Sequence, residues 1–175
     1  MIIKQVRSAI VATLTLAGIM VAASAALANT QAVTFNTTVN PACFLTNPVN
    51  GKLGLDFDNN TLSSTAPASA LTSNAGASAS LTVTCNTTTG ASYRVLSTTN
   101  NTAFTGAINP TSITVTAASN LGTSTATGTT STGAGNAVTI NTTTPTLINI
   151  DLSAVYPSLV PAGDYSFDVV IEALP

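Results

Sequence analysis

The chain has 175 residues, of which only 6% are charged and 5% are aromatic, and it contains neither histidine nor tryptophan. A chain of this length is expected to form one domain. Without histidine the commonest general base is absent, so the composition argues against an enzyme.

The first 28 residues have the features of a secretory signal peptide. Lys4 and Arg7 form its charged start, residues 9–23 its apolar core and residues 26–28 an Ala-Leu-Ala cleavage site, so we expect cleavage after Ala28. An uncleaved membrane anchor is the alternative, but threonine and glycine interrupt the apolar run. No segment of the mature chain is expected to span a membrane.

Removal of the signal peptide leaves two basic and six acidic residues, which gives the mature chain a net charge of −4. An acidic surface repels the phosphates of nucleic acids and the head groups of anionic lipids. We therefore expect neither nucleic acid nor an anionic membrane as a partner.

The new N-terminus begins with a segment patterned as a strand with one apolar face. Val33, Phe35 and Val39 fall on one side of a two-residue repeat, and Thr37 fills the fourth place on that side. Threonine and asparagine occupy the other side. A terminal strand of this kind can pair with its own domain or with a neighbouring molecule.

The only two cysteines, Cys43 and Cys85, lie 42 residues apart. In an exported chain we expect them to form one disulfide, which would stabilise the fold by roughly 4 kcal/mol. Two separate buried thiols are the lesser alternative. A metal site is not expected, because histidine and a second cysteine pair are both lacking.

Further along, apolar residues alternate with polar ones in short segments separated by turn-forming residues, which predicts strands. Residues 60–80 are expected to form a loop or an edge. Residues 118–135, rich in Ser, Thr, Ala and Gly, could be a surface loop or threonine-rich strands. The apolar residues that mark the strands are, in chain order, Leu53, Leu55 and Phe57; Leu81, Val83 and Cys85; Tyr93 and Val95; Ile113 and Val115; Val138 and Ile140; Leu147, Ile148, Ile150 and Leu152.

The last strand is predicted over residues 165–174, after a turn at residues 161–164. Its core-facing set is expected to be Tyr165, Phe167, Val169 and Ile171. No long stretch of the mature chain keeps a helical period. About seven short strands at this spacing indicate an all-β fold, a β-sandwich.

The sequence contains no pattern typical of a catalytic, cofactor or metal site. Asp56 and Asp58 could form a calcium loop, but the glycine and the closing glutamate of an EF-hand are missing, so we expect a solvated turn. Asp164, Asp168 and Glu172 are spaced by four residues. On a strand they are outward charges that oppose edge aggregation.

Several segments resemble a known family. The run TFNTTVNPACFL resembles the first strand of chaperone-usher pilins, in which an alternating N-terminal extension leads into a disulfide cysteine. LGLDFDNN and SASLTVTCNTTTGASYRVLS resemble segments of the archaic pilin branch and of spore coat U domain proteins. VPAGDYSFDVVIEAL resembles their closing segment, and the resemblance does not extend to residues 98–146.

The resemblance implies an immunoglobulin-like β-sandwich that lacks one strand and is completed by donor-strand exchange. In such pilins a periplasmic chaperone first fills the open groove, and the N-terminal extension of the next subunit then replaces it at the outer-membrane usher. Applied to this chain, residues 29–40 would be the donor extension and residues 41–175 the pilin domain. The inserting side chains would be Val33, Phe35, Thr37 and Val39.

The function that the resemblance implies is structural: a homopolymeric subunit of a cell-surface pilus that serves adhesion and biofilm formation. The alternative is a self-contained secreted β-sandwich, such as a coat or matrix protein, whose N-terminal strand belongs to its own sheet. An enzyme is the third and least favoured class.

Overall fold

The computed structural model describes residue 34, residues 36–68 and residues 75–175. The chain divides into two units, residues 1–37 and residues 38–175. Every described strand lies in the second unit, and the described residues form no helix, which confirms the all-β prediction. None of them therefore forms a helix that could cross a membrane. The signal peptide predicted from the sequence lies outside the described residues.

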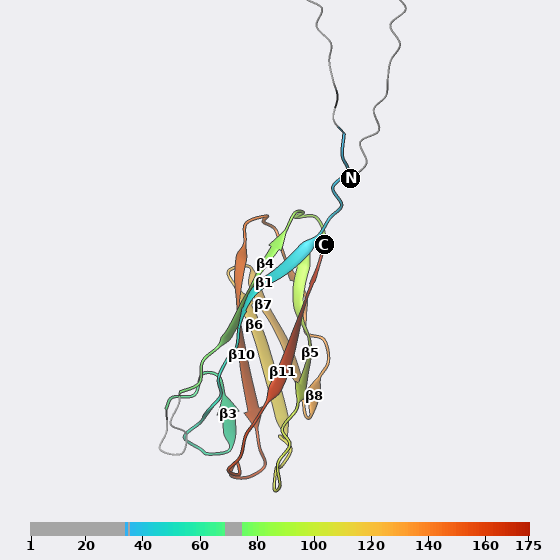
Figure 1. The fold of residues 1–175 in the computed structure, drawn as a ribbon. Coiled ribbons are helices and arrows are strands. Elements are labelled where there is room, and N and C mark those ends of the chain that lie inside the picture. Colours follow the sequence, from blue (N-terminus) through green and yellow to red (C-terminus); the bar gives the residue numbers. More distant parts are fainter. Residues whose placement is uncertain (1–33, 35, 69–74) are drawn as a thin grey trace, which may run out of the picture. The chain divides into compact units, whose positions relative to one another are not determined.

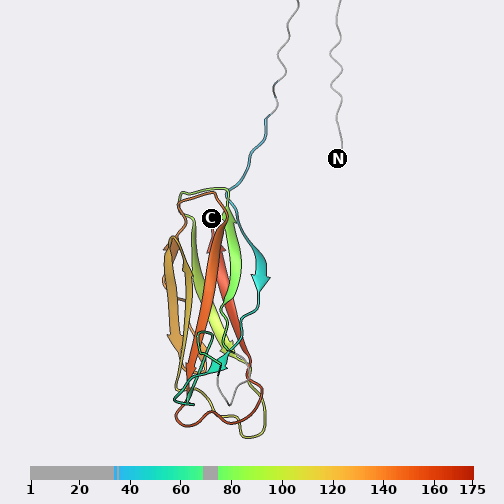
Figure 2. The same ribbon diagram turned by 90° about the vertical axis from the view of Figure 1, so that its left-hand side faces the viewer.

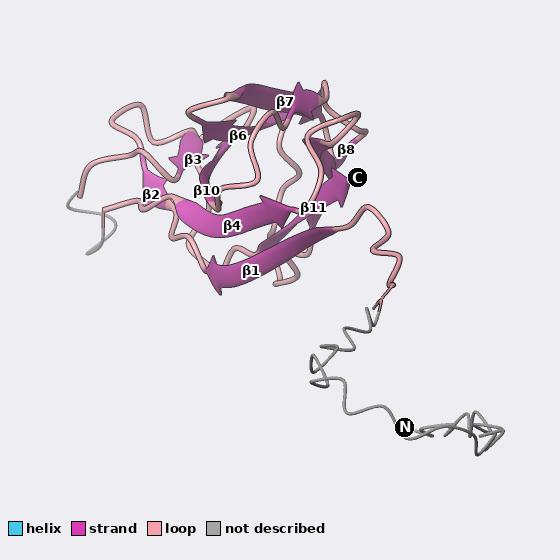
Figure 3. Ribbon diagram, turned by 90° about the horizontal axis from the view of Figure 1, so that it is seen from above, coloured by secondary structure: helices cyan, strands magenta, loops and turns pink. Residues whose placement is uncertain are grey.

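The described residues contain eleven strands, which pair in a continuous antiparallel sheet (Figure 1). Neighbours follow the order β1-β4-β10-β6-β7-β8-β5-β11, while β3 joins β2 to β10 and β9 pairs with β5. Figure 3, which looks along the strands, shows them around a shared interior, an arrangement consistent with a β-sandwich. The strands are β1 (Cys43–Val49), β2 (Gly54–Leu55), β3 (Thr61–Ser63), β4 (Ala79–Cys85), β5 (Ser92–Asn100), β6 (Ser112–Ser119), β7 (Gly122–Gly128), β8 (Ser131–Thr132), β9 (Val138–Thr139), β10 (Thr146–Val155) and β11 (Phe167–Leu174).

The core is built from alternate residues of each strand, because successive side chains of a strand point to opposite faces. On β10, for example, Ile148 is fully buried, whereas its neighbour Leu147 is 56% exposed. The same alternation on β4, β5 and β6 agrees with the pattern predicted from the sequence. The large, fully buried side chains of these four strands are Val83, Tyr93, Val95, Ile113, Val115 and Ile148.

Tyr93 links β5 to the hairpin formed by β6 and β7. Its buried hydroxyl donates a hydrogen bond to the carbonyl oxygen of Gly122 at 2.8 Å and lies 2.9 Å from the hydroxyl of Ser119. Close by, the backbone N–H of Val95 donates to Oγ of Ser124 at 3.0 Å. These bonds satisfy polar groups inside the fold, where an unpaired group would be costly.

The structure shows whether two regions form strands or loops, a question that the sequence pattern left open. Within residues 118–135, β7 and β8 form threonine-rich strands, and Ser124 and Ala126 point inward and are buried. Pairing with β6 along the whole of β7 compensates for these small side chains, because it satisfies the backbone of β7. Residues 60–80, expected to be a loop or an edge, include β3 and the start of β4.

One predicted core residue is wrong. Phe57 was expected to continue the inward alternation of Leu55, but it lies in a turn and is 77% exposed. The backbone N–H of Asp56 donates to the carbonyl of Thr61, and that of Asn59 donates to the carbonyl of Asp56. These bonds reverse the chain directly after Leu55, so the alternation ends there. The solvated turn predicted around Asp56 and Asp58 is therefore present.

Tyr156 has a buried hydroxyl that makes no hydrogen bond within the described part of the chain. Its ring packs edge-on against that of Tyr165, with centroids 5.7 Å apart. We expect Tyr156→Phe to raise the free energy of unfolding by about 1 kcal/mol, because it removes a desolvated, unpaired hydroxyl and keeps the ring contact. Tyr165→Phe is the control: that hydroxyl donates to the Pro161 carbonyl at 2.7 Å, so its loss should destabilise the fold.

Denaturant titration at pH 7 measures the free energy of unfolding of both variants. The same measurement at alkaline pH tests whether the buried, unpaired hydroxyl of Tyr156 is the cause of the effect of Tyr156→Phe. Burial, together with the charge of Tyr165, raises the pKa of Tyr156 to about 12. The unfolded chain loses this proton near the ordinary pKa of about 10, so ionisation favours unfolding as the pH rises from 10 to 12. Tyr156→Phe should lose part of that alkaline destabilisation. An unchanged pH profile would contradict this explanation.

Candidate functional site

Two strands, β1 and β11, stand at the ends of the strand order and are each paired on one side only. β1 pairs with β4, and β11 pairs with β5. Figure 2 shows β1, coloured cyan, at one margin of the fold. Along their other sides, both strands carry backbone N–H and C=O groups that no strand within the described ranges binds. Such edges can accept a further strand.

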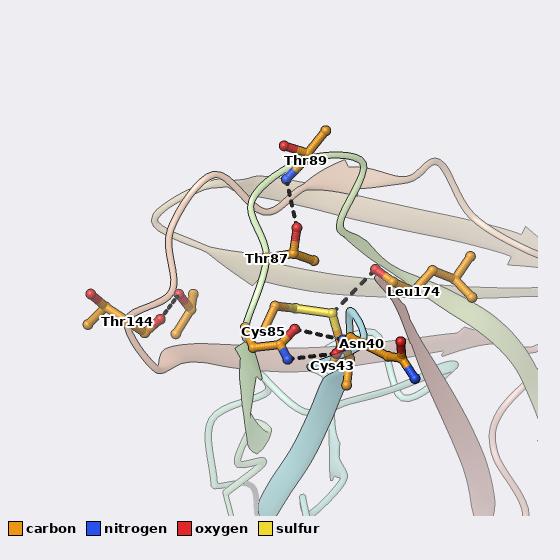
Figure 4. Close-up of a disulfide and its surroundings, with 10 residues drawn as sticks. Asn40, Cys43, Cys85, Thr87, Thr89, Thr144 and Leu174 are labelled. Carbon is orange, nitrogen blue, oxygen red and sulfur yellow. Dashed lines mark hydrogen bonds between the residues drawn. A yellow bond between two sulfur atoms is a disulfide. The ribbon is translucent and has the colours of Figure 1, made fainter. Parts of the chain in front are cut away.

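At one end the two edge strands are close together, beside the disulfide. Cys43 and Cys85 face each other across β1 and β4 and are bonded, with Cα atoms 4.1 Å apart, as the sequence predicted. Sγ of Cys43 also lies 3.4 Å from the carbonyl oxygen of Leu174, the last residue of β11 (Figure 4). A disulfide sulfur carries no proton, so this is a packing contact. The disulfide holds β1, whose side chains are largely exposed, on the sheet.

Away from the disulfide, β1 and β11 border a cavity of about 980 Å³, which we call the edge groove. Its walls come from the end of β1, from β4, β10 and β11, and from the segments that adjoin them. Lys52, Asp164 and Asp168 are the charged residues of its lining. The apolar lining consists of Pro48, Val49, Leu53, Leu62, Ala79, Leu81, Ile150, Leu152, Tyr165, Phe167, Val169 and Val170, with Gly51 and Gly163 beside them.

Several inward-facing side chains beside the edge groove are less well covered than those of the central strands, although Leu62, Ile150 and Leu152 of its lining are buried. Leu81, Phe167 and Val169 pack against the core but stay half-buried, whereas Ile113 and Ile148 on central strands are completely buried. Partly covered apolar side chains thus lie next to two open strand edges, to which a further strand could in principle be added. Such a strand would bury apolar side chains in the groove and extend the backbone ladder.

Of the four predicted closing-strand residues, Tyr165, Phe167 and Val169 line this groove, whereas Ile171 does not. Phe167, Val169 and Ile171 alternate inward as predicted, but all three are half-buried. Tyr165 precedes β11, which begins two residues later than expected, and it too is half-buried. On the outward face, Glu172 forms an ion pair of 2.7 Å with Arg94.

The predicted donor residues are described only in part. Val33 and Phe35 lie outside the described residues. Thr37 and Val39 belong to no strand, and the side chain of Val39 is 72% exposed. Residues 36–42 thus add no strand to the sheet of their own domain.

The sequence did not predict that Leu53 and Leu81 line the edge groove. It predicted that Leu53 and Leu81 point inward, but alternation does not reveal which inward residues remain uncovered. The described residues contain no group of three or more His, Cys, Asp or Glu side chains placed to hold a metal ion. The candidate site in this part of the chain is therefore the edge groove, with the two strand edges that border it.

Comparisons with protein-family models, with curated proteins and with solved structures found no match to this chain.

Proposed function

We propose that the protein is the structural subunit of a chaperone-usher type surface pilus, with an immunoglobulin-like sandwich completed by a strand from another subunit. The observation that carries the proposal is the edge groove, a cavity lined by both apolar and polar residues and bordered by two strands that are each paired on one side only. The donor would be the N-terminal extension of a neighbouring copy, through Val33, Phe35 and Val39, with Thr37 in the remaining place.

The extension fits the edge groove in length and chemistry. The nine residues from Gln31 to Val39 span about 30 Å when extended, and β11, with eight residues, offers an edge of similar length. The extension carries no charged residue, which suits an apolar lining. Burial of its three large apolar side chains would contribute roughly 5 to 9 kcal/mol, offset by the cost of ordering the segment.

An open apolar groove with two free strand edges would also promote aggregation of a free subunit. A periplasmic chaperone that covers the groove until assembly, and an outer-membrane usher that exchanges it for the next subunit, would avoid that outcome. Assembled at the cell surface, the subunits would form a pilus that serves adhesion and biofilm formation. This proposal rests on the groove, on the strand-patterned terminus and on the family resemblance of the two ends of the chain.

Deletion of residues 29–39 from the mature chain separates this proposal from a self-contained secreted sandwich. The described part of the deleted segment belongs to no strand, so we expect the melting temperature of the domain to change little. Polymers should be lost, as measured by size-exclusion chromatography and negative-stain electron microscopy. A large fall in melting temperature would instead show that the segment completes its own domain and would favour a coat or matrix protein.

A further inference from the structure

Asn86 holds the segment that leads from the N-terminal extension into β1. The backbone N–H of Ala42 donates to its Oδ1 at 2.7 Å, and its Nδ2 donates to the carbonyl oxygen of Asn40 at 2.9 Å. Its own backbone N–H donates to the carbonyl oxygen of Ala42 at 3.0 Å. Figure 4 shows Asn40 beside the disulfide, so this clamp lies directly next to the covalent link between β1 and β4.

The clamp extends the pairing of β1 and β4 past the point where the backbone ladder ends. Pro41 has no N–H to donate, so strand pairing cannot continue through it. The side-chain amide of Asn86 takes over, because it offers one acceptor and one donor to the backbone on either side of Pro41. Proline also restricts Asn40 to an extended conformation.

The bonds from Asn86 therefore hold the chain in place as far as Asn40, and Val39 is the first residue on the N-terminal side that they do not hold. Val39 is also the last apolar residue of the donor pattern. A neighbouring groove that takes Val39 must then begin within about one residue of the clamp. At 3.3 to 3.4 Å per residue, this distance leaves almost no slack between successive subunits.

We propose that Asn86 is a positioning residue that fixes the root of the donor strand and thereby makes the joint between successive subunits short and stiff. This inference rests on the proposed function, since the joint exists only if subunits exchange strands. Without the Asn86 side chain, the backbone bond to the Ala42 carbonyl and the disulfide at Cys43 would remain. Asn40 and Pro41 would then be released into the connector between subunits.

The chain offers a matched control in Asn136, which makes the same two bonds elsewhere. Its Oδ1 accepts from the backbone N–H of Thr125, and its Nδ2 donates to the carbonyl of Thr123, both at 2.8 Å. Asn136→Ala thus removes the same kind of side-chain bridge from β7, which takes no part in the edge groove. Asn86→Asp keeps the acceptor for Ala42 but loses the donor for Asn40.

The test compares filaments of the wild-type mature chain, Asn86→Ala, Asn86→Asp and Asn136→Ala by electron microscopy. We expect the persistence length of Asn86→Ala filaments to fall about twofold or more, because each joint gains flexible residues. Asn86→Asp should fall between the wild type and Asn86→Ala, and Asn136→Ala should match the wild type. Asn86→Ala filaments as stiff as those of Asn136→Ala would overturn the inference, whereas absence of wild-type filaments would overturn the proposed function.

Hydrogen exchange of the purified mature chains gives a second measurement that needs no filament. In Asn86→Ala the amide of Ala42 should exchange on the order of tenfold faster, with β4 and β10 unchanged, because a side-chain acceptor is lost locally. Failure of Asn86→Ala to polymerise, with that local pattern and a normal melting temperature, would support the positioning role. Faster exchange across the whole domain would assign Asn86 a general structural role and overturn the inference.

Discussion

Phe35→Asp is expected to abolish polymerisation while leaving export intact. Phe35 is the largest apolar side chain of the extension, and in the proposed polymer it enters the edge groove of the neighbour. An aspartate in its place would be desolvated in a groove whose lining already holds two carboxylates, Asp164 and Asp168, against one cation, Lys52, at a cost of about 3 to 5 kcal/mol in addition to the lost apolar contact. Each joint should weaken by about a thousandfold or more. Size-exclusion chromatography of the secreted chain measures the loss.

Thr34→Asp is the matched control, since Thr34 and Phe35 are neighbours on opposite faces of the predicted strand. It introduces the same charge one residue away, on the face that points out of the groove. We expect Thr34→Asp subunits to polymerise. If Phe35→Asp subunits polymerise as well as Thr34→Asp subunits do, the extension is not the donor, and the self-contained sandwich becomes the better hypothesis.

Local pattern was sufficient to predict the strands that have large alternating side chains. The apolar residues that marked the strands around Val83, Tyr93 and Ile113 face inward, because period-two alternation directly reflects which face of a strand is buried, whereas Leu147, grouped by the sequence with Ile148 and Ile150, is 56% exposed. The disulfide was predicted from the number of cysteines and from the expectation that the chain is exported. Such features depend on a few neighbouring residues, and these are visible in one sequence.

Features that depend on pairing between distant segments could not be predicted. The threonine-rich β7 is a strand because β6 pairs with it along its whole length, and its own residues indicate this only weakly. Phe57 kept the alternation in sequence, but backbone bonds to Thr61 turn the chain before it. The edge groove depends on which strands lie at the two ends of the sheet, and strand order cannot be read from periodicity.

Mixing two variants that each block one half of the joint should give dimers and nothing longer. Leu81 lies on β4, lines the edge groove and is half-buried, so Leu81→Asp places a carboxylate where a donor strand would pack. Such a subunit has an intact extension but a blocked groove. A Phe35→Asp subunit has an intact groove but a blocked extension. The two variants, unfolded and refolded together, can therefore form only one joint, in which the extension of Leu81→Asp fills the groove of Phe35→Asp.

Thr82→Asp is the control for the groove side, because Thr82 follows Leu81 on β4 and is not part of the groove lining. It pairs with Thr46 and Leu147 on the neighbouring strands, and Leu147 is exposed on the outer face. Refolded with Phe35→Asp, the Thr82→Asp chain should still form polymers, each ended by a Phe35→Asp subunit that can accept but not donate. Size-exclusion chromatography with multi-angle light scattering distinguishes these outcomes. Polymers from the Leu81→Asp mixture would show that strands join outside the edge groove, and purely monomeric chains would show that the extension and the groove are not partners.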